Sequence, residues 1–228
     1  GMVALVHEVK WLLSSDEEAM RVPGFAMGRY RSVNNLKQIG VAMHNYHTAA
    51  DHFPPGGTFG KHGEMGHSWE TYLLPYLESP AKPDLNLPWD HPDNARHFKT
   101  QVEVFLYPRV RRNQLADEQG YALSHYAANN RVFCDNSRIQ IRDVRDGTSN
   151  TIMAGEVREN FKPWGHPINW RDPALGINQS PHGFGSPWRG GAQFLLMDGS
   201  TRFISENVDP ATLKALSTPA GGEEVGSF

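Results

Sequence analysis

The sequence has one cysteine, no long hydrophobic run and almost no net charge. Cys134 alone excludes both a disulfide within the chain and a thiolate zinc cluster. No stretch approaches the roughly 18–20 apolar residues of a membrane-spanning helix, so we expect neither a transmembrane segment nor a secretory signal. The 22 Lys and Arg against 25 Asp and Glu leave a net charge of -3, which argues against a nucleic-acid partner.

A long amphipathic helix is the clearest element that the sequence predicts. The whole chain has 228 residues, which suffices for one large domain or two small ones. Within residues 31–50, one apolar stripe recurs at alternating spacings of three and four residues, and it consists of Leu36, Ile39, Met43, Tyr46 and Ala50. Lys37, Gln38, Asn45 and Thr48 lie off that stripe. We therefore expect this helix to bury one face, most simply against a β-sheet.

Strands are predicted over residues 102–107 and 151–157, and the second is apolar at both parities, as a strand covered on both faces would be. Asp198-Gly199 separates two alternating runs and predicts a hairpin with a two-residue type I′ turn, which sets Phe194 opposite Phe203. Short helices are expected over residues 69–77, 94–100 and 209–216. The predicted fold class is α+β, with the long helix packed on an antiparallel sheet and with long irregular loops.

The first 30 residues predict two short helices instead of one hydrophobic helix. The first covers residues 5–13, and the second begins in the capping pattern at residues 14–18 and ends near Pro23-Gly24. Gly1 before Met2 is typical of a residue left by tag cleavage. Charged residues within this segment, including Glu8 and Lys10, would be costly in a hydrocarbon core, so we expect no membrane insertion by these 228 residues.

Metal ligands are the first chemistry to test, because the chain has 11 histidines. His44 and His47 fall on one side of the long helix, with His52 just beyond it, but no carboxylate completes a site. Acidic and amide groups in residues 135–136 and 143–150 could supply oxygen ligands for calcium, without the spacing of a dedicated calcium loop. We expect ordinary turn chemistry there and no cofactor, and calcium stays open as the alternative.

The remaining candidates do not predict catalysis. The sequence lacks a Gly-x-Ser-x-Gly nucleophile motif and a phosphate-binding loop, so we predict no enzyme. Trp164, Trp170 and Trp188 lie in the irregular region 158–191, where they would either form a ligand-stacking face or pin the loop; we favour pinning. Glu156 ends the strand expected to be buried. It therefore needs a partner, either at the Asn34–Lys37 end of the long helix or among the backbone amides of a neighbouring turn.

Several ordered motifs extend through residues 31–228. The motifs are Asn34-Asn35-Leu36-Lys37-Gln38 running on to His44-Asn45-Tyr46-His47, Phe53-Pro54-Pro55-Gly56, His67-Ser68-Trp69, Asp146-Gly147-Thr148-Ser149-Asn150, Gly155-Glu156, and Asp198-Gly199-Ser200. With them the sequence resembles a pilin-like bacterial family of unknown function that is expanded in planctomycetes and related to the major pseudopilins of type II secretion.

The resemblance implies a pilin-like domain over residues 31–228 and no known catalytic activity. It also implies a place in the cell envelope or outside the cytoplasm, with protein partners of a secretion or pilus-like assembly. The positions that carry the family motifs are Asn35, Gln38, His44, Asn45, Tyr46, Pro54, Asp146, Gly147, Asn150, Glu156, Asp198 and Gly199.

Three departures from the family pattern qualify what the resemblance implies. Residues 2–30 lack the prepilin cleavage motif and the hydrophobic helix, so we expect residues 1–30 to replace or follow a missing membrane helix. Ser32 and Tyr107 occupy positions where the family carries cysteines, and Trp188 stands where its C-terminal signature has a histidine.

Two functions remain open from the sequence. The first is a noncatalytic, pilin-like envelope protein with a structural or assembly role. The alternative is a binding module that holds a glycan or peptide with the Trp-containing loop 158–191. The oligomeric state is not predicted.

Overall fold

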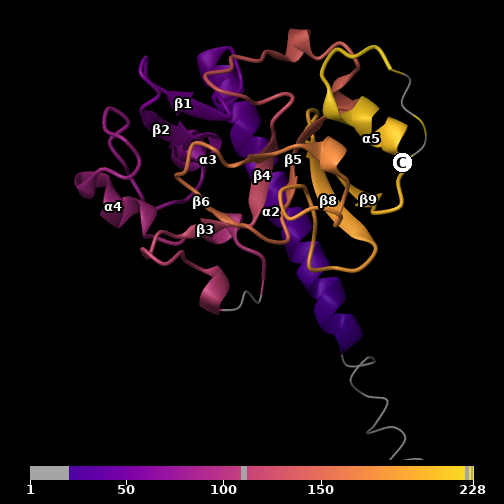
Figure 1. Cartoon of the computed structure of the whole chain (residues 1–228), viewed down its shortest axis with the longest axis horizontal. Helices are drawn as coiled ribbons and strands as arrows, with labels where there is room; N and C mark the ends of the chain where they lie inside the picture. The colour runs from indigo at the N-terminus through magenta and orange to yellow at the C-terminus, as the bar shows by residue number, and fades with distance from the viewer. Residues whose placement is uncertain (1–20, 109–111, 224–225, 227) are drawn as a thin grey trace, which may run out of the picture.

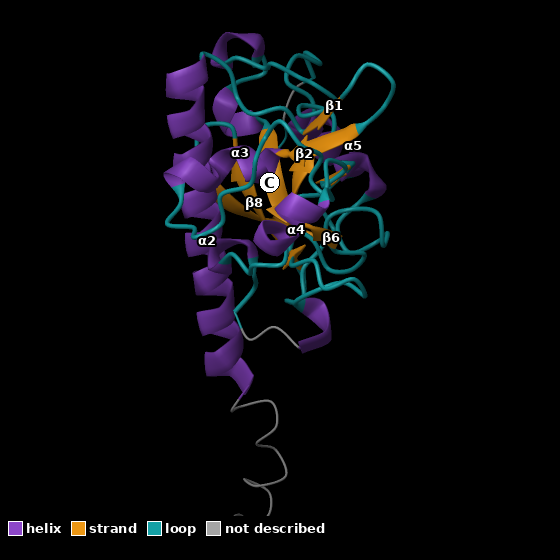
Figure 2. Cartoon of the chain, turned by 90° about the vertical axis from the view of Figure 1, so that its left-hand side faces the viewer, coloured by secondary structure: helices purple, strands orange, loops and turns teal. Residues whose placement is uncertain are grey.

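The computed structural model describes residues 21–108, 112–223, 226 and 228. Its fold is α+β: a long helix, α2 (Arg21–Ala50), packs on a five-stranded sheet (Figure 1). Figure 2 shows α2 along one side of the body, with its N-terminal turns extending past the other described helices, strands and loops. The helix predicted over residues 5–13 lies outside the described residues.

The apolar stripe places α2 on the sheet, as predicted. Leu36, Ile39 and Met43 have no exposed surface. At Gly40 the helix approaches the sheet so closely that a Cβ atom would lie 2.9 Å from Cδ1 of Leu195. The expected helix end near Pro23-Gly24 is wrong, because α2 already includes both residues.

The main sheet has the strand order β7-β4-β5-β8-β9. Its strands are β4 (Tyr126–Asn129), β5 (Ile152–Glu156), β7 (Trp170–Arg171), β8 (Gly191–Leu196) and β9 (Thr201–Ser205). Four of them form an antiparallel set, whereas β7 pairs with β4 in parallel. The prediction of an antiparallel sheet therefore holds for the central strands and is wrong at the β7 edge.

Strand β5 is covered on both faces, as the composition of residues 151–157 predicted. All five residues of β5 are buried. Met153 packs in the core on the α2 side, and Ile152 packs on the opposite side with Leu213 and Leu216 of α5 (Pro210–Ser217). The helix predicted over residues 209–216 is confirmed as α5, and the Asp209 carboxylate caps it by accepting a hydrogen bond from the Thr212 N–H at 3.0 Å.

The predicted hairpin is present, but its turn and register differ from the prediction. Leu196 N–H donates to the Ser200 carbonyl and Gly199 N–H to the Leu196 carbonyl, so the loop has three residues, 197–199. Gly199 has φ 83° and Asp198 lies outside the positive-φ region, which fits a type I turn followed by a left-handed glycine. Phe194 consequently pairs with Arg202 instead of Phe203.

A second group of short elements packs beside the sheet (Figure 1). It comprises the hairpin of β1 (Gly57–Phe59) and β2 (Met65–Ser68), the helices α3 (Trp69–Leu73) and α4 (Pro92–Phe98), and the pair of β3 (Leu123–Ser124) with β6 (Lys162–Pro163). Trp69, Phe98 and Trp164 are its largest fully buried side chains, and they belong to the same core cluster as Leu36 of α2.

The strand predicted over residues 102–107 is wrong. This segment contains the 3₁₀ turn Glu103–Phe105, and Val104 and Phe105 are buried without a sheet partner. The expected helices near residues 69–77 and 94–100 are confirmed as α3 and α4, and a 3₁₀ turn containing Pro75 continues from α3. The other 3₁₀ turns are Arg112–Gln114, Ile141–Asp143, Thr148–Asn150 and Pro173–Leu175.

Candidate functional site

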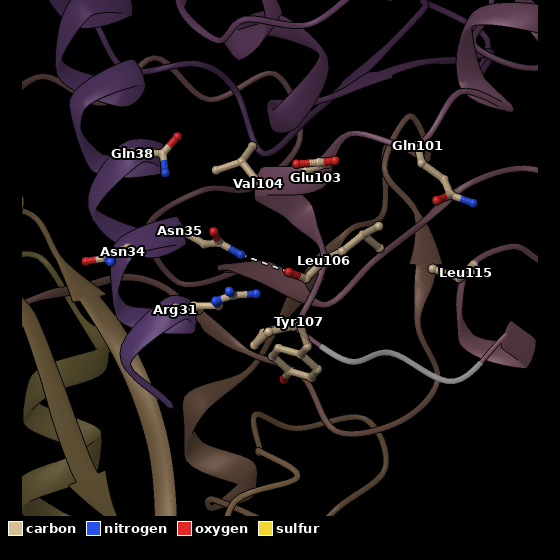
Figure 3. A pocket seen from close by; sticks show the side chains of 11 residues that line it. Arg31, Asn34, Asn35, Gln38, Gln101, Glu103, Val104, Leu106, Tyr107 and Leu115 are labelled. Carbon is tan, nitrogen blue, oxygen red and sulfur yellow. Dashed lines mark hydrogen bonds between the residues drawn. The ribbon is translucent and has the colours of Figure 1, made fainter. Parts of the chain in front are cut away.

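A groove runs beside α2, between this helix and the segment around the turn Glu103–Phe105. It consists of two adjoining cavities of about 600 and 720 Å³, and we call the two together the α2 groove. Both cavities are lined by Gln38, Gln101, Glu103 and Val104, so they form one continuous hollow. Figure 3 shows the first cavity, with the α2 side chains on one wall and Gln101 and Leu115 on the other.

Asn35 ties the helix wall of the groove to its floor. Its Nδ2 donates to the Leu106 carbonyl at 2.8 Å (Figure 3) and to the Tyr126 hydroxyl at 3.3 Å. The Leu106 carbonyl thereby gains a partner that a neighbouring strand would otherwise supply. This contact accounts for an apolar segment that is buried in the fold without joining a sheet.

A directional chain of hydrogen bonds leads from the groove to a buried carboxylate. Ser32 Oγ donates to Glu156 Oε1 at 2.5 Å, so the Tyr126 hydroxyl, 2.9 Å from Ser32 Oγ, donates to Ser32. The Tyr126 oxygen in turn accepts from Asn35. Trp188 Nε1 and the Gln193 N–H also donate to Glu156, at 3.2 and 2.7 Å. Each donor therefore points toward the Glu156 carboxylate.

The partners of Glu156 match the sequence expectation in type more than in identity. The helix contributes Ser32 instead of a residue from Asn34–Lys37, and the backbone amide comes from strand β8 instead of a turn. Burial raises the pKa of Glu156, while the four donors, Gln193, Ser32, Ser186 and Trp188, oppose that shift. Trp188 thus supplies an N–H to this carboxylate.

A second buried carboxylate, Glu70 of α3, was not singled out from the sequence. It accepts from Ser124 Oγ at 2.6 Å and from Asn169 Nδ2 at 2.9 Å. Burial raises its pKa well above the usual range, and these two hydrogen bonds oppose the shift. Asn169 Nδ2 also donates to the Tyr126 carbonyl at 3.1 Å, so Glu70 is connected to β4 through Asn169. Neither carboxylate lines either cavity of the α2 groove.

His125 holds the far wall of the groove. Its Nδ1 accepts from the Tyr107 N–H at 2.9 Å, so the ring proton resides on Nε2, which donates to the Gln114 carbonyl at 2.9 Å. Tyr107 and Leu115, the neighbour of Gln114, both line the first cavity. Burial lowers the pKa of His125 to about 4, against a weaker opposing contribution from the Gln114 carbonyl. The neutral imidazole is the form that fits both contacts.

The other family-motif residues gather mainly at the opposite end of α2. The Asp198 N–H donates to the Thr148 carbonyl. Gly199 lies against His44, because a Cβ atom added at Gly199 would be 3.6 Å from Nε2 of His44. Asp146 accepts from the N–H groups of Gly221 and Gly222 at 2.6 and 3.0 Å, which secures the C-terminal segment. The two Asp-Gly motifs are therefore brought together around turns, away from the groove.

The remaining motif positions have local roles. Asn150 Nδ2 donates to the carbonyl of Asp146 at 3.3 Å, across Gly147, whose φ is 97°. Tyr46 packs edge-on against Tyr72 and Tyr76, Asn45 is exposed, and Pro54 is buried.

The proposed metal ligands are occupied by packing and turn contacts. His44 and His47 both pack against Phe53, and the His52 ring bonds to the Phe53 carbonyl at 2.7 Å. Asn136 pairs with both backbone groups of Phe59. Among the described residues, no group of three or more His, Cys, Asp or Glu side chains is arranged to hold a metal ion.

The three tryptophans of region 158–191 do not form one exposed face. Trp164 is fully buried and donates from Nε1 to the Thr100 carbonyl at 3.0 Å. Trp188 is 9% exposed, and Trp170 is half-buried. The buried pair anchors the loop to the core, in agreement with the pinning interpretation.

Comparison with known proteins identifies a family. A family model described as "Protein of unknown function (DUF1559)" matches residues 26–176 and 162–211. Searches of the curated proteins and of the solved structures gave no match. The family match carries no link to the pseudopilins of type II secretion.

Proposed function

Because the chain belongs to the DUF1559 family, whose description assigns no activity, we propose its function from its own structure. We infer a noncatalytic, pilin-like protein of the cell envelope with a structural or secretion-related assembly role. The proposal rests on one observation, the apolar outer face of α2.

The outer face of α2, defined by Met27, Tyr30 and Val41, lies opposite the buried stripe. These three side chains are 58%, 68% and 61% exposed. At about 100° per residue they fall within a sector of about 60°, on the side of the helix away from Leu36 and Ile39, and share this sector with the polar residues Asn34, Asn45 and Thr48. Large apolar side chains that share one line of an exposed helix are typical of a surface that another helix or protein covers. This supports an assembly role for α2.

The absence of catalysis is supported by the state of the two buried carboxylates. Glu70 and Glu156 are fully buried, and each is held by hydrogen bonds to neighbouring groups. A general acid or base must reach a reacting atom in a substrate pocket. Both carboxylates instead join helices to strands, which is a structural role.

A glycan-binding face built from Trp164, Trp170 and Trp188 is not favoured, because two of these rings are buried.

Localisation tests the proposal directly. The described residues contain no helix that is both long and apolar enough to cross a membrane. We expect the protein, expressed from its own gene in its own host, to fractionate with the cell envelope. An epitope can be inserted at the exposed loop around Gly63, where an added Cβ would meet no atom within 4 Å. Recovery in the cytosol would overturn the proposal.

The isolated 228 residues provide a second test. We expect them to stay soluble without detergent, to remain in the supernatant with liposomes and to form no filaments alone, because residues 2–30 carry charges such as Glu8 and Lys10. Sedimentation and electron microscopy at neutral pH measure this. Filaments of the chain alone would place the whole assembly surface in the folded domain.

A further inference from the structure

The α2 groove is lined by side-chain amides that take no part in the hydrogen bonds between its walls. Asn34 and Gln38 of α2 and Gln101 of the opposite wall line it. In the part of the chain that the structure describes, these three carboxamides make no hydrogen bond, whereas Asn35 beside them is fixed to the floor. Each free carboxamide presents one acceptor and two donor hydrogens to the groove.

The spacing of the helix carboxamides matches an extended peptide. Asn34 and Gln38 are four residues apart, so they lie about 6 Å apart along the axis of α2. Alternate peptide groups of an extended chain repeat every 6.6 Å or so. A strand running along α2 would therefore place one backbone amide opposite each carboxamide. A helical ligand would not, because its backbone groups are already bonded internally.

The length of the groove fits a short segment. Its α2 wall runs from Arg31 to Val41, which is about 15 Å of helix. That length accommodates about five residues of extended chain. Val104 and Leu106 in the floor, with Leu77 in the second cavity, provide apolar contacts for the side chains that point inward.

The charges of the groove favour an uncharged ligand. Arg31 and Lys37 are balanced by Glu78 and Glu103 along the lining. A strongly anionic or cationic polymer would meet like charges at two of these four positions. A glycan commonly stacks on an open aromatic face, but Tyr107 of the first cavity is only 8% exposed. Tyr76 of the second cavity is half-buried and packs edge-on against Tyr46.

We propose that the α2 groove binds an extended segment of a partner protein, about five residues long, without net charge and with apolar side chains at alternate positions. Asn34, Gln38 and Gln101 bond to its backbone, and the floor receives the inward side chains. This inference does not depend on the envelope role, although Val41 belongs both to the outer face of α2 and to the lining of the second cavity.

The test compares two double variants of the whole chain. Asn34→Asp with Gln38→Glu removes the two free amide donors of the α2 wall without changing side-chain size and leaves Gln101 in place. Asn45→Asp with Gln119→Glu makes the same chemical change at two exposed positions outside the groove. The probe is an array of random peptides of about 12 residues, long enough to span the groove. Affinities for the peptides it selects are measured by fluorescence polarisation, and circular dichroism checks that both variants are folded.

We expect the chain to select uncharged peptides with alternating apolar residues. The groove variant should weaken their binding by about tenfold or more, while the control variant should bind as the unmodified chain does. Three results would overturn the proposal: no peptide bound at a Kd below about 1 mM, an equal loss in both variants, or binding of oligosaccharides that the groove substitutions abolish. The last result would assign the groove to a glycan.

Discussion

Replacement of His125 should change how the stability of the protein depends on pH. The ring has no exposed surface, its Nδ1 accepts from the Tyr107 N–H, and its Nε2 donates to the Gln114 carbonyl. A second ring proton would have to sit on Nδ1 and face another donor. The folded chain therefore disfavours the imidazolium ion through burial and through the loss of this hydrogen bond.

The magnitude follows from the lowered pKa of His125. Burial lowers it from 6.5 to about 4, and each tenfold change in proton affinity corresponds to about 1.4 kcal/mol. The stabilisation is fully present above pH 6.5 or so and is lost as the pH falls from there toward 4. At pH 4 the loss amounts to about 3 kcal/mol, to within a factor of about two.

The variant His125→Gln isolates this contribution, because the other titrating groups, including the buried Glu70 and Glu156 and the half-buried His166, remain in both proteins. Urea unfolding followed by tryptophan fluorescence gives the free energy of unfolding of each protein from pH 7 to pH 4. We expect the unmodified protein to be the more stable at pH 7, and its advantage to shrink by about 3 kcal/mol at pH 4. His182→Gln at an exposed position controls for the substitution itself. A constant difference between the His125 variant and the unmodified protein would refute the reasoning.

Further substitutions test the packing, the turn and the buried network by the same unfolding measurement. Ile39→Ala should cost about 2–5 kcal/mol, and Val41→Ala, 61% exposed on the same helix, well under 1 kcal/mol or so; a loss below about 1 kcal/mol for Ile39 would make α2 peripheral. Gly199→Val should cost about 1–3 kcal/mol because of its positive φ, while Asp198→Asn should be nearly neutral, and equal melting temperatures for both would contradict the turn. Glu156→Gln should cost about 1–3 kcal/mol, since its amide would face one of the donors that now bond the carboxylate; an unchanged stability would show that the network is dispensable.

The elements that the sequence predicted well carry a local signal. The stripe through Leu36, Ile39 and Met43 has the helical period, and the same residues are buried on the sheet. Asp209 followed by Pro210 marks a helix start by capping chemistry, and α5 begins there. In both cases neighbouring residues alone determine the outcome.

The failures have a different origin. An apolar run such as residues 102–107 suits either a strand or a buried irregular segment, and contacts with Asn35 and His125, far away in the sequence, decide between them. At the hairpin, Asp-Gly occurs in both two-residue and three-residue loops, and the extra loop residue changes which side chains pair. Neither choice is encoded in the segment itself.

The candidate site was predictable only in part. Asn35, Gln38 and Glu156 were singled out as motif positions, and the need of Glu156 for partners followed from its burial. The opposite wall of the groove comes from residues more than 60 positions along the chain, such as Gln101 and Leu115, which no local pattern joins to α2. Its existence depends on tertiary packing.

The assembly role of α2 is tested most directly by photo-cross-linking in living cells of the host. A photoreactive amino acid is placed at Met27 or Tyr30, on the outer face and outside the groove, and in a control at Leu175, which is 43% exposed and lies beside α5 on the far side of the sheet. We predict a discrete adduct in the envelope fraction from both α2 positions and none from Leu175. No adduct from α2, or the same adducts from all three positions, would contradict the account.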